Sequence, residues 1–532
     1  MKVLISDKLS KEGVEILKAA KGIEVIDRPG LPLDELKKVI ADVEGLIVRS
    51  ATKVNAELLA AAPKLKAIAR AGAGVDNIDC EAASRRGIIV MNTPCGNTVS
   101  AAEHALAMLF SLARSIPAAD ALMKQEVWEK KKFTGKELTG KTLGIVGVGR
   151  IGAEVARRAV GLRMNVLGFD PFLNAEQAKA LGIEVAPSLE DLLKRSHFVT
   201  VHASMTDKTK GMIGAKELAS AKKGIALINC ARGGIIDETA LVAALDSGQV
   251  SGAALDVFTS EPPADWALAK HPKVIATPHL GASTEEAQLN VAVAAAEQMV
   301  DALLNNKVRF AVNFPSMDAE EMAALGPYMG LGRRLGAIAG QLCGAPVKEV
   351  NVVYSGAVAA LKTEPVSVSV AAGLLSAYVE DVNLVNARVL LKERGITMKE
   401  TRTSESEDFV SYMAVEVRAG AETHVAGGTL FGRSSPRLVL IDGFTLEIEP
   451  AGSVLFIRNE DVPGVIGEVG RILGDHKINI ANMSNGRRSA GGAALTVVST
   501  DSAPAPRVLA ALEGARNVLA VKIVRLDGGA SA

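Results

Sequence analysis

The chain has little cysteine and no excess of charge of either sign. Its four cysteines, Cys80, Cys95, Cys230 and Cys343, are isolated from one another in 532 residues. Neither a disulfide framework nor a site with clustered thiolate ligands is therefore predicted, and buried thiols in a reducing compartment are expected. The 60 basic residues balance the 60 acidic ones. Without a long basic run, nucleic acid and anionic membranes are disfavoured as partners.

Long hydrophobic runs are also missing. No uninterrupted apolar stretch reaches the roughly 18 residues that a membrane helix requires. The N-terminus, Met1–Asp7, runs directly into a strand pattern and lacks the apolar region of a signal peptide. We therefore expect a soluble, cytoplasmic protein. Its length exceeds what one core accommodates, so about three or four domains are expected.

What the chain does contain is a glycine-rich turn after a strand. Leu143–Val146 reads as a short buried strand, and Gly147, Gly149 and Gly152 then form G-x-G-x-x-G at the start of a helix. Such a turn uses its glycines for a tight bend, for close approach of a pyrophosphate and for helix–strand packing. The helix N-terminus adds unpaired N–H groups. A dinucleotide site is predicted, with a purely structural turn as the alternative.

A second strand supplies the acid that such a site needs. Asn165–Phe169 ends at Asp170, 18 residues beyond Gly152, where a ribose-binding carboxylate is expected. A carboxylate accepts from the 2′-hydroxyl of adenosine and repels a 2′-phosphate. Pro171 and Phe172 follow, and no arginine stands beside the acid. The predicted cofactor is therefore NAD.

Strands and helices alternate through the first 300 residues, which predicts βαβ units on parallel sheets. The expected strands are Lys2–Ile5, Gly45–Val48, Ala67–Ala69, Ile88–Met91, Phe198–His202, Ala226–Asn229, Gly252–Ala254 and Val274–Ala276, and the expected helices are Ser10–Ala20, Asp34–Ile40, Ser100–Leu112 and Ser283–Leu304. After Pro315 the character changes to valine-rich strands, helices and glycine turns. A small α+β module follows, with strands at Val454–Ile457, Asn479–Met483 and Val518–Arg525 and a helix at Val465–Leu473.

Three polar residues in the second α/β region carry the predicted chemistry. Arg232 follows a strand, where open α/β sheets bind ligands, and its guanidinium can hold a carboxylate by two hydrogen bonds. His279 titrates near neutrality and can take or return the proton that accompanies hydride transfer. Glu261, in a rigid loop before two prolines, would orient His279 and favour its imidazolium form. Taken singly, each residue has a simpler interpretation: Arg232 as a partner in a surface ion pair, His279 as an ordinary histidine and Glu261 as an exposed loop acid.

These residues lie in motifs that resemble the D-isomer-specific 2-hydroxyacid dehydrogenase family. The matching segments follow the family's order and, together with the later domains, span nearly the whole chain: Val48–Thr52, Arg70–Asn77, Gly147–Gly152, Asn229–Asp237, Glu261–Pro263 and Pro278–Ser283. Beyond Pro315 the chain resembles the longer members of the family. The resemblance implies an α/β fold with two Rossmann-like doubly wound lobes, followed by an α+β intervening domain and a C-terminal ACT domain of βαββαβ order. The implied limits are 1–98 with 286–314 for substrate, 99–285 for NAD, 315–450 for the intervening domain and 453–526 for ACT.

The resemblance also implies a role for each motif residue. Arg232 binds the substrate carboxylate, His279 is the acid–base group and Glu261 is its partner. Cofactor contacts are implied for Gly147, Gly149, Arg150, Ile151, Gly152, Asp170, Ala203, Cys230, Ala231, Arg232, Asp256, His279 and Gly281, with Asp256 meeting the nicotinamide carboxamide. Substrate contacts are implied for Arg49, Arg70, Gly74, Arg232 and His279, with Arg49 and Arg70 facing a phosphate. No metal is implied.

The chain departs from the family at two cofactor positions. Ala203 stands where a threonine or leucine before proline is common, so a side-chain hydroxyl contact is lost there while backbone contacts can persist. Ala73 replaces a residue that is threonine in some members, which removes a side-chain contact at that position.

For the long form, the resemblance implies NAD-dependent oxidation of 3-phospho-D-glycerate to 3-phosphohydroxypyruvate, the first step toward L-serine. Two alternatives stay open. One is a glyoxylate or hydroxypyruvate reductase of the same family, and the other is a nucleotide-sensing interaction protein like the family's corepressors.

The resemblance finally implies assembly and control. ACT domains pair side by side and often bind an amino acid at their interface, so Asn459, Asp461 and Asn479 would face L-serine. A module that only assembles subunits is the alternative. A homotetramer is expected.

Overall fold

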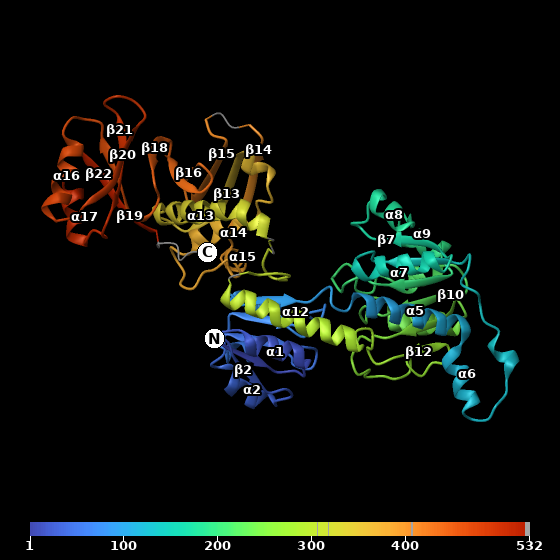
Figure 1. The fold of residues 1–532 in the computed structure, drawn as a ribbon. Coiled ribbons are helices and arrows are strands. Elements are labelled where there is room, and N and C mark those ends of the chain that lie inside the picture. Colours follow the sequence, from blue (N-terminus) through green and yellow to red (C-terminus); the bar gives the residue numbers. More distant parts are fainter. Residues whose placement is uncertain (306, 316, 318, 406–407, 527–532) are drawn as a thin grey trace.

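The computed structural model describes residues 1–305, 307–315, 317, 319–405 and 408–526. In chain order, its sheets have five, seven, six and four strands. Figure 1 shows the first two sheets in separate lobes joined by α12 (Glu285–Leu304), with the two later sheets side by side beyond the first lobe. The predicted fold class, two doubly wound lobes followed by two α+β units, is confirmed.

The first lobe is a parallel sheet of order β2-β1-β3-β4-β5. Helix α12 packs back onto it, so Val291 and Met299 share one core with Val3 and Ile47. A Cβ on Gly13 would lie 2.9 Å from the carbonyl oxygen of Ala292, so α1 and α12 are in close contact. The elements are β1 (Lys2–Ile5), α1 (Lys11–Ala19), β2 (Glu24–Asp27), α2 (Leu33–Ile40), β3 (Gly45–Val48), α3 (Ala56–Ala60), β4 (Ala67–Arg70), α4 (Cys80–Arg85) and β5 (Ile89–Asn92).

The second lobe is a parallel sheet of order β12-β11-β10-β9-β6-β7-β8, covered on both faces by helices. Strands β7 and β8 follow on one side of β6, and β9 pairs with the other side of β6. The strand order therefore reverses at β6, where ligands bind in such folds. The elements are β6 (Thr142–Val146), α7 (Arg150–Gly161), β7 (Asn165–Phe169), α8 (Ala175–Leu181), β8 (Glu184–Val185), α9 (Leu189–Arg195), β9 (Phe198–Val201), α10 (Ala215–Ser220), β10 (Ile225–Asn229), α11 (Glu238–Asp246), β11 (Val250–Leu255) and β12 (Val274–Ala276).

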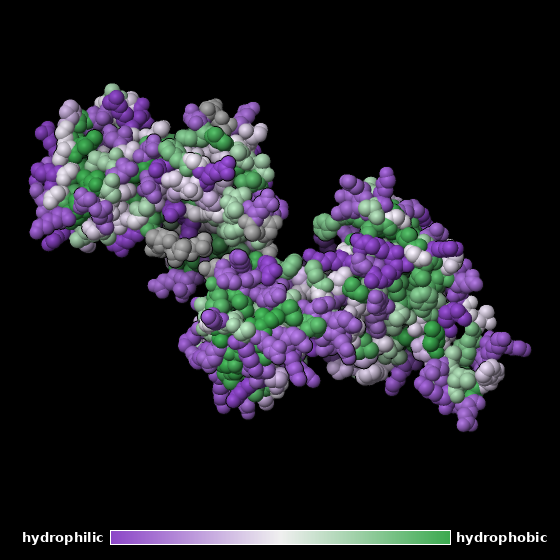
Figure 2. All heavy atoms as spheres, in the orientation of Figure 1, coloured by the Kyte–Doolittle hydropathy of each residue, from purple (hydrophilic) through white to green (hydrophobic). Residues whose placement is uncertain are grey.

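Three helices lie between β5 and β6 in the chain: α5 (Thr98–Arg114), α6 (Ile116–Met123) and the 3-10 helix η1 (Lys130–Phe133). Helix α5 is largely buried in the second lobe, whereas α6 has no buried residue and projects from it at the lower right of Figure 1. In Figure 2 pale green atoms lie among the purple ones on this projection. Among the described residues no single helix is long and apolar enough to cross a membrane; α5 and α6, bent by 64°, meet that criterion only as a pair.

The two later units have mixed and antiparallel sheets. Helices α13 and α14 pack against each other and on the six-stranded sheet, whose order is β14-β13-β15-β16-β17-β18. The elements of this unit are α13 (Ala319–Leu342), β13 (Val347–Gly356), η2 (Ala357–Ala360), α14 (Glu364–Leu375), α15 (Ala387–Glu393), β14 (Thr397–Thr403), β15 (Ser411–Ala419), β16 (Glu422–Phe431), β17 (Ser435–Ile441) and β18 (Phe444–Ile448). Residues 306, 316, 318 and 406–407 of the predicted units lie outside the described residues.

The last unit has the βαββαβ order expected of an ACT domain, on an antiparallel sheet of order β20-β21-β19-β22. Its helices bury one apolar face each, for example Val469 and Leu473, against that sheet. The elements are β19 (Gly452–Glu460), α16 (Val465–Asp475), β20 (Ile480–Arg487), β21 (Ala493–Thr500), α17 (Pro506–Glu513) and β22 (Val518–Leu526).

Candidate active site

The glycine turn joins β6 to α7, and each of its glycines has a distinct surrounding. Gly147 has a φ of +89°, and a Cβ there would lie 2.8 Å from the backbone nitrogen of Ala203. A Cβ on Gly152 would lie 2.1 Å from the carbonyl oxygen of Gly147, so helix and turn pack without room for a side chain. Among the described residues, no atom lies within 4 Å of a Cβ built on Gly149. That open side exposes the N-terminus of α7 to a pyrophosphate.

Asp170 follows β7 beside this turn. Its carboxylate accepts hydrogen bonds from the backbone N–H groups of Val148 at 2.9 Å and Phe172 at 2.8 Å. These bonds hold the acid at the place where the ribose hydroxyls of a dinucleotide lie in such folds. Arg150 and Ile151 form the first turn of α7 directly beyond. The arrangement fits NAD.

The carboxylate of Asp256, which follows β11, is fully buried. Its Oδ1 accepts from Thr277 Oγ1 at 2.6 Å and from the backbone of Leu280 at 2.7 Å, and its Oδ2 accepts from the backbone of Gly281 at 2.8 Å. Burial acts to raise the pKa of Asp256, but hydrogen bonds from His104, Thr277 and the two backbone groups outweigh it and lower the pKa. Asp256 is therefore an anionic acceptor beside the predicted nicotinamide position.

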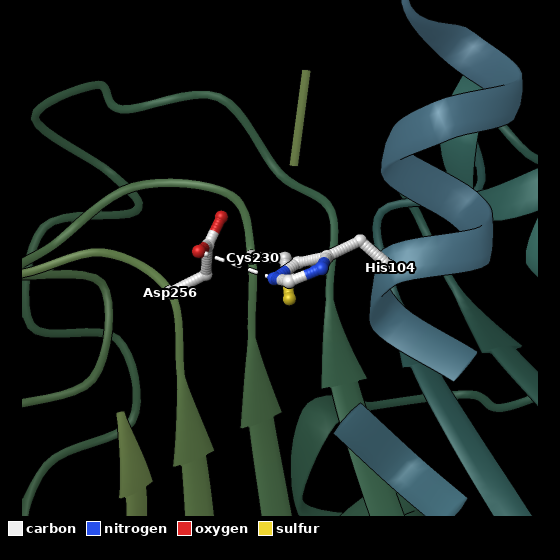
Figure 3. A group of neighbouring side chains, drawn as sticks. All are labelled: His104, Cys230 and Asp256. Atoms are coloured by element: carbon white, nitrogen blue, oxygen red, sulfur yellow. Dashed lines mark ion pairs between the residues drawn. The ribbon is translucent and has the colours of Figure 1, made fainter. Parts of the chain in front are cut away.

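Figure 3 shows His104, Cys230 and Asp256 converging at the carboxyl ends of the strands. One ligand atom from each lies within 4.8 Å of the others. The set does not suit a metal ion, because the ring nitrogen of His104 and Oδ1 of Asp256 already contact the hydroxyl of Thr277. Burial also raises the pKa of the Cys230 thiol, which disfavours a thiolate ligand near neutrality. That the protein holds no metal ion remains a prediction from the sequence.

The loop after β10 is held by Asn229, a buried residue that the sequence analysis did not single out. Its Oδ1 accepts from the backbone of Ala231 at 3.0 Å, and its Nδ2 donates to the carbonyl of Arg232 at 2.9 Å. Both bonds fix the segment that begins at Cys230. The sequence does contain a signal for this role, because Asn229 is a polar residue at the end of the otherwise apolar strand β10.

Arg232 reaches from this loop to the first lobe. Its Nε donates to Asp76 Oδ2 at 2.8 Å, and its Nη1 donates to the carbonyl of Ala231 at 2.7 Å. A Cβ on Gly74 would lie 1.8 Å from Arg232 Nη2, so a side chain at this position would displace the guanidinium. The predicted substrate residues Arg232 and Gly74 are therefore adjacent, and Asp76 is a partner that sequence reasoning missed.

His279 and Glu261 form the predicted pair. His279 Nδ1 lies 2.7 Å from Glu261 Oε2, and the two side chains are 46% and 41% exposed, so they are accessible from solvent. The hydrogen bond to Glu261 raises the pKa of His279, although burial acts in the opposite direction. Because Nδ1 is hydrogen-bonded to the carboxylate of Glu261, Nε2 is the ring nitrogen available for proton transfer. The geometry suits an acid–base group.

Three arginines, Arg49, Arg70 and Arg232, lie close together near this pair. Burial, together with the positive charges of Arg232 and Arg49, lowers the pKa of Arg70 to about 10. Among the described residues none hydrogen-bonds the buried Nε of Arg70. Arg49 is oriented by Asp7, whose Oδ2 accepts from the Arg49 backbone at 2.6 Å. Mutual repulsion and an unmatched donor are what a site for a multiply charged anion would show before its ligand binds.

The three predicted effector residues do not meet within one chain. Asn459 is buried and its Oδ1 accepts from Thr496 Oγ1 at 3.0 Å. Asp461 lies in the loop after β19, whereas Asn479 precedes β20 at the opposite end of the sheet, where its Nδ2 donates to Asp501 at 2.6 Å. A ligand that contacts both ends needs two copies of the module.

Three family models match consecutive parts of the chain. Residues 106–281 match the D-isomer specific 2-hydroxyacid dehydrogenase NAD binding domain, residues 324–442 match the D-3-phosphoglycerate dehydrogenase intervening domain, and residues 453–517 match the ACT domain. Among solved structures, a D-lactate dehydrogenase from Aquifex aeolicus complexed with NAD and lactic acid is similar, with a TM-score of 0.52 and 27% identity over 59% of this chain and 100% of that one. A glyoxylate reductase from Paecilomyes thermophila has a TM-score of 0.54 and 29% identity, covering 59% of this chain and 98% of that one.

Relatives of the same length are more similar in sequence. A D-3-phosphoglycerate dehydrogenase of Bacillus subtilis is 42% identical over 526 residues, covering 99% of both chains. One from Archaeoglobus fulgidus is 41% identical over 513 residues, covering 96% of this chain and 97% of the other. With a dehydrogenase NAD domain, a matching intervening domain and an ACT domain in one order along its length, the chain belongs to the D-3-phosphoglycerate dehydrogenase family.

Proposed function

We propose that this chain oxidises 3-phospho-D-glycerate to 3-phosphohydroxypyruvate with NAD as the hydride acceptor. The observation that carries the proposal is the gathering of Arg49, Arg70 and Arg232 near the His279–Glu261 pair. The substrate has a carboxylate and a phosphate on either side of its C2 hydroxyl, and guanidinium groups bind both kinds of anion. The full-length relatives named D-3-phosphoglycerate dehydrogenase support the same substrate.

The predicted roles combine into one reaction. When bound, NAD supplies the nicotinamide ring that accepts the C2 hydride. His279 Nε2 takes the hydroxyl proton, and Glu261 at Nδ1 stabilises the resulting imidazolium. Arg232 holds the carboxylate, while Arg49 and Arg70 hold the phosphate. The alcohol thus loses one proton and one hydride and becomes a ketone.

The cofactor residues are proposed as a continuous surface of the second lobe. The turn Gly147–Gly152 and the start of α7 would bind the pyrophosphate, Asp170 the ribose, and Asp256 with Gly281 the nicotinamide side. Ala203, Cys230 and Ala231 would contribute backbone contacts.

The proposed domains keep their predicted limits of 1–98 with 286–314, 99–285, 315–450 and 453–526. The cytoplasmic location also remains a prediction.

An assay of turnover distinguishes this activity from its two alternatives, the reductase and the interaction protein. The full chain is assayed with 3-phosphoglycerate and NAD, and in the opposite direction with glyoxylate or hydroxypyruvate and NADH. A higher kcat/KM for the phosphorylated pair supports the proposal, because the two phosphate-facing arginines serve no unphosphorylated substrate. Preference for glyoxylate or hydroxypyruvate would assign the reductase activity instead. NADH binding without turnover of any of these substrates would indicate an interaction protein.

L-serine is the proposed effector of the ACT module. A pocket there is lined by Asp461, Pro463, Gly464, Arg487 and Gly491. The Asp461 carboxylate is held by the backbone N–H of Gly491 and by Arg487, both at 3.1 Å, and these bonds lower its pKa. An anionic Asp461 suits the amino group of an amino acid. Asn479 of a second copy would complete the site.

A homotetramer is proposed as the assembly. Ile116, Met123 and Val127, on and next to the projecting α6, are apolar and exposed, and Trp128 reaches 80% exposure. A second copy of the chain is the occupant we propose for this surface, because isolated apolar projections are costly in water. Sedimentation of the wild type and of Trp128→Glu tests it: an unchanged assembly in the variant would contradict a contact through this segment.

A further inference from the structure

His104 lies beside the predicted nicotinamide site, but the reaction above gives it no role. It comes from α5, where its neighbours on the buried face are Ala101, Ala105 and Met108. Its ring points toward Asp256, with the sulfur of Cys230 beside it (Figure 3). An imidazole among these apolar neighbours needs a polar partner, because burying an unpaired polar group is costly.

That explanation lies in two oxygen atoms. His104 Nε2 is 3.2 Å from Thr277 Oγ1 and 3.2 Å from Asp256 Oδ1. Thr277 has one hydroxyl proton, and at 2.6 Å from the anionic carboxylate that proton is donated to Asp256. The oxygen of Thr277 is therefore left as an acceptor. Both contacts of His104 Nε2 are then to acceptors, which assigns the proton to Nε2.

The consequence is a chain of donors aimed at one carboxylate. His104 donates to Thr277 or Asp256, Thr277 donates to Asp256, and the backbone of Leu280 and Gly281 completes the set. With Oδ1 occupied by these groups, Oδ2 accepts one backbone N–H and keeps a further lone pair. A carboxamide N–H can be accepted there only while the carboxylate stays in this orientation.

We propose that His104 is a positioning residue for hydride transfer: with Thr277 it fixes the orientation of the Asp256 carboxylate that receives the nicotinamide carboxamide. The inference rests on the role of Asp256 in the proposed function. His104 does not touch the reacting atoms. Its effect therefore depends on whether the cofactor has a carboxamide N–H to give.

That dependence provides the test. 3-Acetylpyridine adenine dinucleotide carries a methyl group in place of the carboxamide NH₂ and cannot donate to Asp256. His104→Leu should raise the KM for NAD by about fivefold, the scale of one weakened hydrogen bond, and change the KM for the analogue by less than about twofold. His104→Gln keeps an N–H donor and should recover most of the NAD value. Equal effects on both cofactors, or none on either, would overturn the proposal.

Three further variants make the result specific. Met108→Leu changes packing at the same place, 4.0 Å from Thr277 Oγ1, without removing a donor, and should affect NAD and the analogue alike. His104→Phe repeats the comparison with a planar ring if the leucine variant does not fold. Asp256→Ala should abolish the discrimination between the two cofactors. If it does not, the role of Asp256 is wrong; if it does while His104→Leu leaves discrimination intact, only the positioning role of His104 fails.

Discussion

Arg232 and Asp76 join the two lobes, with the Nε of the arginine 2.8 Å from Oδ2 of the acid. They lie 156 residues apart in sequence. One guanidinium edge is thereby used for orientation, and Arg232 keeps Nη2 close to Gly74, where the substrate carboxylate is proposed to bind. Asp76 is itself 65% exposed, so its contribution is reduced by solvent.

Removing the acid should disorient the arginine. Asp76→Ala should lower kcat/KM for 3-phosphoglycerate by about tenfold, whereas Asp76→Asn retains an acceptor and should lose about threefold or less. Steady-state kinetics with both variants measure this. Asp27→Ala, at the exposed edge of the same lobe, is the matched control. Equal kinetics for Asp76→Ala and the control would show that Arg232 needs no partner.

The pH dependence follows from the pair at the centre of the site. The hydrogen bond to Glu261 raises the pKa of His279, and only the neutral imidazole can accept the hydroxyl proton. For oxidation, kcat/KM should therefore rise with pH through the raised pKa of His279. Glu261→Gln removes the anion, so that rise should move to lower pH. His279→Asn should lose about 10²–10⁴-fold in turnover.

The measurement is a pH–rate profile of kcat/KM for the wild type and both variants. A Glu261→Gln profile with its acidic limb at unchanged or higher pH would contradict the pairing. Near-normal turnover of His279→Asn at every pH would remove His279 from the mechanism.

The parts of the fold that could be predicted are those with an unambiguous pattern. Buried strands such as Lys2–Ile5 and Gly45–Val48 are continuous apolar runs between turns, and the structure has them at those limits. Strand Glu24–Asp27 was missed because it lies at the sheet edge with only two apolar residues, a pattern shared with loops. Short helices such as α3 and α4 give too few turns to show a period.

The same distinction holds for the site. Arg232, Glu261 and His279 each lie in a local motif, so sequence alone could nominate them. Asp76 and His104 depend on contacts with residues more than 150 positions away, which exist only once the lobes and α5 have packed. The family resemblance likewise named Asn459 as an effector residue, but its burial depends on the pairing of β19 with β21, from which Thr496 donates to it, and no local pattern reveals that contact.

Cofactor choice should depend on Asp170. Asp170→Ala removes the acceptor for the ribose hydroxyl and the repulsion of a 2′-phosphate, and it also releases the N–H groups of Val148 and Phe172. The KM for NAD should rise and the preference for NAD over NADP should narrow. Kinetics with both cofactors test this, with Glu176→Ala on the following helix as a control. An unchanged preference would mean that other groups select the cofactor.

The phosphate contacts should be selective for phosphorylated substrate. Arg70→Ala or Arg49→Ala removes one cation from this cluster, in which burial and the neighbouring positive charges lower the pKa of Arg70. Each change should reduce kcat/KM for 3-phosphoglycerate by about tenfold or more, and for an unphosphorylated 2-hydroxy acid by far less. The ratio of the two values is the measurement. Equal losses on both substrates would point to a carboxylate-binding or structural role.

Control by serine should require two copies of the ACT module, because Asp461 and Asn479 lie at opposite ends of one sheet. Serine can inhibit only if it binds one arrangement of the catalytic lobes more tightly than another. Calorimetry with L-serine should show binding to the wild type and at least tenfold weaker binding to Asn479→Ala, which removes an amide hydrogen bond. Asn482→Ala, an exposed amide on the adjoining strand, should bind as the wild type does. Absence of binding to the intact protein at millimolar serine would leave the module with assembly as its role.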